Sequence, residues 1–286
     1  MHGLMKLLLV LLAFSSAALA TEQDAAVPDK GALAAALMHK SGMDVQIELI
    51  PDQIKAGIRD AARHGSPMDV VIQDKLVSAL DTQSLNRDVK DYLVAHMNSD
   101  EMRQVLTWLE SPLGQQVVAM EINASQPDMM MKMFEVFQHE QARPGRLERI
   151  HRLDEAVLSK ERTKDLMINI QVFFGMAMVA ESGSAQRASY SLTRNNTERA
   201  MAPMWDELQQ VVTMMYLFTY RGLDDAELDR YLEFTESAAG RKYNQVLYEG
   251  LSYAFAHAGK SLRQSLKSAC RARQKGCDGT HPYPLV

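Results

Sequence analysis

Residues 98–116 have the sequence NSDEMRQVLTWLESPLGQQ, and residues 224–242 have the sequence DDAELDRYLEFTESAAGRK. When residues 100–121 are placed on residues 226–247, a shift of 126 positions, five of the 22 pairs are identical. Self-similarity at a fixed separation is typical of a duplicated structural unit. The alternative is that two amphipathic helices resemble each other by composition alone.

Both stretches begin with the spacing of a capping box, in which a side chain and a glutamate three residues later satisfy each other's backbone N–H groups. Asn98 and Glu101 have this spacing in the first stretch, and Asp224 and Glu227 have it in the second. Each pair therefore predicts the start of a short helix.

A large aromatic residue on the buried face, a serine and a glycine then follow in the same register. The serine is expected to end this short helix and to cap the next one. The glycine lies in the first turn of the new helix, where its missing Cβ is expected to let another helix approach closely. These residues are Trp108, Ser111 and Gly114 in the first copy, and Phe234, Ser237 and Gly240 in the second.

The rest of the chain also has helical periodicity, and no stretch combines strict alternation with β-branched or aromatic enrichment. The sequence therefore predicts an all-α protein of two tandem, related helical bundle units, residues 31–141 and 146–269. Each unit is expected to have five or six helices, and the two units are expected to pack together. Trp108 and Phe234 are expected in equivalent buried sites.

Three further segments carry turn or loop signals. Pro144-Gly145 is expected to stop a helix and to set a turn between the two units. The polar stretch from Glu181 to Glu198 is predicted to be a long surface loop. Pro51 either kinks a helix over Met43 to Arg63 or begins a new helix.

The N-terminus has the order of a secretory signal peptide: Lys6, an apolar run from Leu7 to Phe14, and small residues that end at Ala20. Residues 1–20 are therefore predicted to be cleaved after Ala20, with Met5 as an alternative start. The alternative to a signal peptide is a buried N-terminal helix. Residues 21–30 are expected to be a flexible segment, and the mature protein is predicted to be periplasmic or secreted.

Composition excludes several classes of protein. The 286 residues are 47% apolar and 23% charged, with a net charge of −5, which argues against disorder and against a broadly basic nucleic-acid-binding surface. Two cysteines exclude a disulfide scaffold and a four-cysteine zinc site. No nucleic-acid partner and no cofactor are expected.

Three local patterns suggest chemistry, and each has a structural alternative that we prefer. His151, Asp154 and Glu155 share a helix face that suits a metal, but their neighbours indicate a solvated, mixed-charge helix. Gly250 to Ala254 approximates a hydrolase nucleophile elbow, yet it lies in a helical run from Tyr243 to Leu266. The 19 methionines, densest at Met129, Met130, Met131 and Met133, suit core packing, an adaptable apolar surface or copper(I).

The C-terminal tail, residues 270–286, contains both cysteines. In an oxidising compartment Cys270 and Cys277 are predicted to form a disulfide that restrains the tail. The basic residues around these cysteines could contact anionic lipid headgroups, an acidic partner or the acidic surface of another copy, or could be a solvated helix end favoured by the helix dipole. They are Lys260, Arg263, Lys267, Arg271, Arg273 and Lys275.

The aromatic-x-x-Ser-(Pro/Ala)-x-Gly pattern resembles a bacterial family of unknown function, DUF2059, in which the motif commonly has the form Phe-Tyr-x-Ser-Pro-x-Gly-x-Lys. Residues Trp108 to Gln116 lack the tyrosine and the final lysine, and residues Phe234 to Lys242 lack the tyrosine and the proline. The resemblance implies an exported, all-helical protein and implies no established activity.

Three functions are compatible with these patterns. The leading one is a non-enzymatic protein-interaction or chaperone-like module whose partner is another envelope protein. The alternatives are a carrier of an apolar ligand or lipid between helices, and an enzyme whose catalytic residues lie far apart in the sequence. The basic C-terminal segment also allows peripheral contact with a membrane.

Overall fold

A computed structural model of the chain describes residues 29–63, 70–126, 129–137, 143–157, 160–181 and 190–272. The described residues form helices joined by short turns, and none of them forms a strand, so the predicted all-α class is confirmed. The predicted signal peptide lies outside the described residues, as does most of the tail that contains Cys277.

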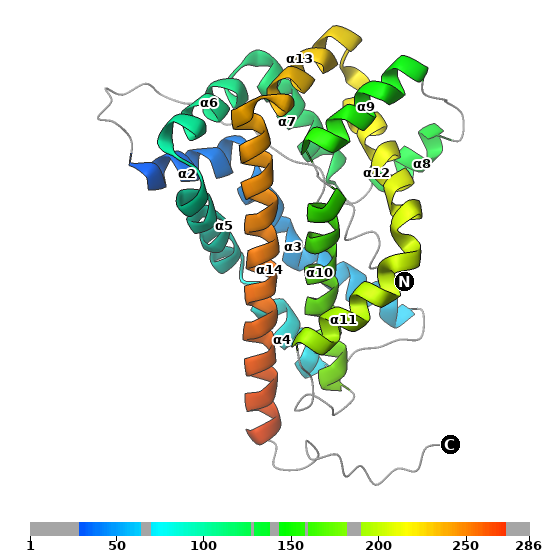
Figure 1. Cartoon of the computed structure of the whole chain (residues 1–286). Coiled ribbons are helices and arrows are strands. Elements are labelled where there is room, and N and C mark those ends of the chain that lie inside the picture. Colours follow the sequence, from blue (N-terminus) through cyan, green and yellow to red (C-terminus); the bar gives the residue numbers. More distant parts are fainter. Residues whose placement is uncertain are drawn as a thin grey trace.

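The described residues of the first half form six helices followed by a short seventh (Figure 1). Their bounds are α2 Lys30–Lys40, α3 Met43–Arg63, α4 Val70–Ala79, α5 Thr82–His96, α6 Ser99–Leu109, α7 Pro112–Ala124 and α8 Met129–Phe137.

The described residues of the second half form six helices, and short 3-10 turns lie before and after the fourth of them. Their bounds are α9 Pro144–Val157, α10 Lys160–Glu181, α11 Tyr190–Met201, α12 Trp205–Thr219, α13 Asp225–Glu236 and α14 Ala238–Ala272, with 3-10 turns at Ala202–Met204 and Tyr220–Gly222.

The long helix α14 runs through the molecule and packs most extensively against α10 and α5 (Figure 1). In the first half, α2 packs on α6 and α5. In the second half, α9 packs on α13 and α12. Helix α14 therefore contacts helices from both halves and joins them into one core.

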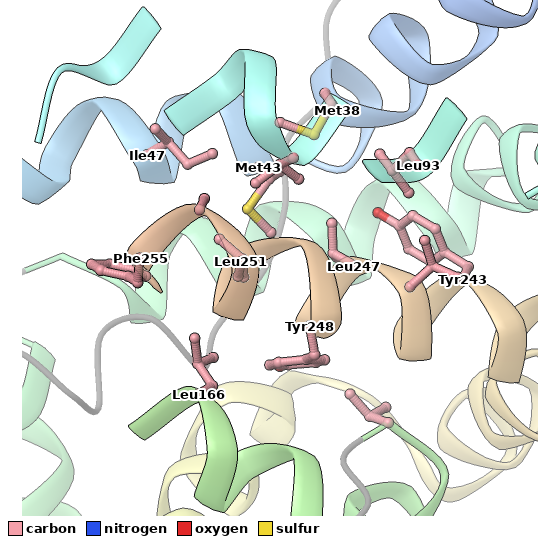
Figure 2. Close-up of a cluster of buried hydrophobic side chains, with 14 of the residues drawn as sticks. Met38, Met43, Ile47, Leu93, Leu166, Tyr243, Leu247, Tyr248, Leu251 and Phe255 are labelled. Carbon is pink, nitrogen blue, oxygen red and sulfur yellow. The ribbon is translucent and has the colours of Figure 1, made fainter. Parts of the chain in front are cut away.

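Figure 2 shows this core along α14. Tyr243, Leu247 and Leu251 of α14 lie toward α3 and the end of α2, whereas Tyr248 lies toward α10. A helix packed between two layers needs apolar residues on more than one face, which the sequence of α14 provides. The buried partners from other helices labelled in Figure 2 are Met38, Met43, Ile47, Leu93 and Leu166, and Phe255 belongs to α14 itself.

One expectation about chain breaks is wrong. Pro144 begins α9 instead of stopping a helix, because the first position of a helix needs no backbone N–H. Arg143 accepts the first hydrogen bonds of this helix from the backbone of Arg146 and Leu147. Pro51 lies inside α3, so it does not begin a new helix; the helix has the predicted bounds, and the predicted kink stays a prediction.

The predicted loop over Glu181–Glu198 is also wrong for its described part, because Tyr190–Met201 forms α11. The Arg194 side chain forms ion pairs with Asp165 on α10 and with Glu198 one turn later in α11. These contacts stabilise a helix that its serine- and asparagine-rich sequence does not predict. Among the described helices, none is both long and apolar enough to cross a bilayer.

Candidate functional site

Both predicted capping boxes are present. Asn98 Oδ1 accepts from the Glu101 backbone at 2.9 Å, and the Asn98 backbone donates to Glu101 Oε2 at 2.7 Å. The equivalent distances between Asp224 and Glu227 are 2.7 and 2.9 Å. Helices α6 and α13 therefore begin with the same two reciprocal hydrogen bonds.

The serine of each copy has the same two contacts. Ser111 Oγ donates to the Trp108 carbonyl at 2.6 Å and accepts from the Gly114 backbone at 3.0 Å. Ser237 Oγ donates to the Phe234 carbonyl at 2.7 Å and accepts from the Gly240 backbone at 3.0 Å. Each serine connects the end of one helix to the start of the next.

The structure assigns the two glycines a different role from the one expected. A Cβ on Gly114 would lie 2.1 Å from the Trp108 carbonyl oxygen, and a Cβ on Gly240 would lie 2.0 Å from the Phe234 carbonyl oxygen. The close approach is therefore by the end of the preceding helix in the same chain segment, and not by a separate packed helix.

The two aromatic residues of the motif contact each other. The ring centroids of Trp108 and Phe234 are 3.9 Å apart and the ring planes differ by 6°. Trp108 also stacks on Tyr231, with centroids 5.2 Å apart. The expectation of two equivalent buried sites is therefore corrected: both rings are only partly buried, and they share one contact.

A cavity of about 30 Å³ lies next to this stack, where residues of α6, α7, α9, α12, α13 and α14 meet. This volume is enough for about two water molecules. Ten of its twelve lining residues are buried, and only Trp108 and Phe234 are partly exposed. The lining residues are Trp108, Leu109, Val118, Glu121, Val157, Tyr216, Tyr220, Tyr231, Phe234, Tyr243, Asn244 and Leu247.

Glu121 is the carboxylate of this cavity, and its residue is only 4% exposed. The Tyr220 hydroxyl donates to Glu121 Oε1 at 2.5 Å, and the Tyr231 hydroxyl donates to the same oxygen at 3.0 Å. A buried carboxylate needs such donors because transfer out of water is costly. We did not single out Glu121 from the sequence, although it shares the buried face of α7 with Val117 and Val118.

The tyrosines around Glu121 are held in the neutral form. Burial raises their pKa values above the ordinary value of 10.0, and the nearby Glu121 raises them further. The Tyr216 hydroxyl and Asn244 Nδ2 are buried without a hydrogen-bond partner. The five tyrosines with raised pKa values are Tyr216, Tyr220, Tyr231, Tyr243 and Tyr248.

Three pairs of lining residues lie 126 positions apart in the sequence. One pair is aromatic in both copies, and the other two combine a polar with an apolar residue. The pairs are Trp108 with Phe234, Val118 with Asn244, and Glu121 with Leu247. The two copies of the motif therefore contribute matched positions to one cavity, and they differ in polarity at those positions.

The other candidate patterns have the following places in the structure. No group of three potential metal ligands occurs within the described residues, and Asp154 instead accepts a hydrogen bond from Gln209. Ser252, at the centre of the elbow-like sequence, lies within α14 and donates to Asp165 Oδ2 at 2.6 Å. In the methionine cluster, Met133 is buried in the core.

The arginines near His151 have specific partners, whereas we expected a solvated helix. On α9, Arg149 Nε lies 2.7 Å from Asp229 Oδ1 of α13. Arg146 forms an ion pair with Asp225 of α13, and Arg152 forms one with Glu236 of α13. These contacts connect α9 to α13.

The C-terminal basic segment is described only in part. Lys260 is exposed on α14, and the same helix contains Arg263, Lys267, Cys270 and Arg271, whose side chains lie outside the described residues. Arg273, Lys275 and Cys277 follow beyond the described chain. The disulfide and the contact with an anionic partner therefore remain predictions.

Comparison with known proteins gives one family match. Residues 83–139 match the model of a family described as an uncharacterised protein conserved in bacteria (DUF2059), so the resemblance predicted from the motif is confirmed over this segment. The segment includes Trp108 and Glu121. Neither a curated protein nor a solved structure matches the chain.

Proposed function

We propose that this protein is a non-enzymatic binding module of the bacterial envelope, formed by duplication of one helical unit. The two copies are α2–α7 and α9–α14. Five of the six pairs of corresponding helices have similar lengths, with 21 and 22 residues in α3 and α10 and 15 residues in both α5 and α12. The exception is α14, which has 35 residues where α7 has 13. The packing of α2 on α6 and α5 corresponds to the packing of α9 on α13 and α12.

The observation that carries the binding role is the polarity of the cavity between the copies. An apolar lining would cost less free energy on folding, because burial of a polar group is unfavourable unless the group is hydrogen-bonded. Glu121 of the first copy corresponds to Leu247 of the second copy. Asn244 of the second copy corresponds to Val118 of the first copy. Tyr220 and Tyr231 offset this cost at Glu121 by donating to it. The Tyr216 hydroxyl and Asn244 Nδ2 of the same lining are buried without a partner, and unsatisfied polar groups in a cavity are typical of a site that receives a ligand.

The lining favours binding over catalysis. It contains one carboxylate and no histidine, cysteine, serine or threonine, so the common nucleophile and base pairs are missing from it. Its volume of about 30 Å³ is too small for a lipid acyl chain, so this cavity gives no support to the lipid-carrier alternative. The occupant is therefore a small polar group, either free or part of a partner protein.

Native mass spectrometry of the tagged protein, isolated from its own bacterial envelope, tests this role. We expect a fraction of the protein to carry an added mass, a small molecule or a polypeptide, and Glu121→Leu to lose it. Leu192→Ala, which changes an exposed residue of α11 away from the cavity lining, is the control and should retain the added mass. An added mass that is equal in wild type and Glu121→Leu, or absent from both, contradicts the proposal.

A further inference from the structure

We infer that the cavity beside Trp108 and Phe234 receives a primary ammonium group at the end of an unbranched aliphatic chain. The group belongs either to a free alkylamine or to a lysine side chain of a partner protein. This inference rests on the proposed binding role and specifies the chemistry of the group that is bound.

The charge and the rings of the lining select a cation. Glu121 is a carboxylate, and the lining contains no lysine, arginine or histidine. Opposite charges attract strongly in a medium of low dielectric constant. Aromatic faces attract cations as well, and this attraction increases when the cation is desolvated. The aromatic residues of the lining are Trp108, Tyr216, Tyr220, Tyr231, Phe234 and Tyr243.

The hydrogen-bonding groups match an ammonium ion, which has three donors and no acceptor. Tyr220 and Tyr231 use their hydroxyl hydrogens on Glu121, so towards an ammonium ion their oxygens can act only as acceptors. The buried Tyr216 hydroxyl has no partner and can accept as well. A half-turn of the Asn244 amide would exchange its unpartnered Nδ2 for an acceptor oxygen.

Size separates a primary amine from other organic cations. An ammonium group is about as large as a water molecule, and the cavity of about 30 Å³ accepts about two waters. A quaternary ammonium or a guanidinium group is several times larger than one water. Among the described lining residues only Trp108 and Phe234 are partly exposed, so we expect the aliphatic chain of the ligand to leave on their side of the cavity.

Calorimetric titration of the full chain with n-butylammonium, tetramethylammonium and n-butanol tests the inference. We expect saturable binding of n-butylammonium alone, and binding at least tenfold weaker in Glu121→Gln. Glu207→Gln removes the same charge from an exposed position of α12 and should bind as the wild type does. Circular dichroism establishes that each variant has folded, and Glu121→Leu is the second cavity variant.

Two peptides distinguish the sources of the amine: one short peptide contains a central lysine, and the other contains N-acetyl-lysine. Binding of the lysine peptide but not of its acetylated form assigns the site to a partner protein, whereas binding of n-butylammonium alone assigns it to a free amine. Equal binding of n-butanol and n-butylammonium overturns the inference and leaves the binding role intact. Failure of all amines to bind overturns the inference, while the envelope isolation above decides the binding role separately.

Discussion

The rings of Trp108 and Phe234 stack face to face, with centroids 3.9 Å apart, although 126 positions separate them in the sequence. Each ring belongs to the same position of its motif copy. Contact of a residue with its own counterpart is what a local two-fold relation produces, as in a symmetric dimer interface. The stack therefore supports the proposed duplication and marks where the two copies meet.

This stack should contribute a measurable coupling energy. We expect a double-mutant cycle of Trp108→Ala and Phe234→Ala, measured by urea denaturation, to give a coupling of about 1 kcal/mol, typical of aromatic pairs. Trp205→Ala combined with Phe234→Ala is the control, because no ring contact joins these two residues, and should be additive within about 0.5 kcal/mol. An additive result for the first pair would show that the contact does not form.

The motif glycines should not tolerate a methyl group. Gly114→Ala and Gly240→Ala place a Cβ about 2 Å from a backbone carbonyl oxygen, which cannot move without displacing the helix end. We expect each to reduce the free energy of unfolding by about 2–4 kcal/mol. Gly145→Ala, whose Cβ would lie 3.5 Å from a flexible arginine side chain, should be neutral or slightly stabilising. Equal effects at all three glycines would contradict this account.

The motif serines should be equivalent in energy. Ser111→Ala and Ser237→Ala each remove one hydroxyl that caps a helix and also donates to the preceding carbonyl. We expect each variant to lose about 1 kcal/mol of stability in urea denaturation. Ser252→Ala is not a matched control for these two variants, because Ser252 caps no helix and its hydroxyl instead donates to Asp165 of α10. A large loss at only one motif serine would show that the two copies are not alike.

The buried tyrosines should make the protein sensitive to alkali. Their native pKa values lie above the unfolded value of 10.0, so their stabilising contribution is complete below pH 10 and is lost as the pH rises through the native values. In that range each such tyrosine lowers the free energy of unfolding by about 1.4 kcal/mol per pH unit, and five together lower it by about 7 kcal/mol per pH unit. Urea midpoints at pH 9, 10 and 11 should therefore fall steeply. Five tyrosinates appearing at 295 nm before helicity is lost would contradict this expectation.

Asp154 and Asp229 should respond to pH in opposite directions. Desolvation raises the native pKa of Asp154, partly offset by the Gln209 hydrogen bond, so its contribution is favourable below the unfolded pKa of 3.8 and is lost as the pH rises. We expect Asp154→Asn, which still accepts from Gln209, to raise the melting temperature at pH 7 and to have little effect at pH 3.

The hydrogen bond from Arg149 lowers the pKa of Asp229, so its contribution is present above pH 3.8 and is lost as the pH falls through the native value. Asp229→Asn should therefore lower the melting temperature at pH 7 and lose this effect in acid. Melting curves of both variants from pH 3 to 7 measure the contrast. A shift of the same sign for both would show that the two environments are not as described.

The sequence alone determined the helical class and the local geometry of the motif. Capping boxes and serine caps join atoms only three residues apart, so residue type and spacing suffice to predict them. The loop expected before Glu198 was wrong because contacts with Asp165, more than twenty positions away, outweigh the weak helical preference of that segment.

Only the tertiary structure decided the site. The hydrogen bonds from Tyr220 and Tyr231 to Glu121 join residues 99 and 110 positions apart. No local spacing specifies which buried face meets which, because apolar packing is not directional and many pairings bury similar areas. The sequence could place Glu121 on a buried helix face, but its partners follow from how the helices pack.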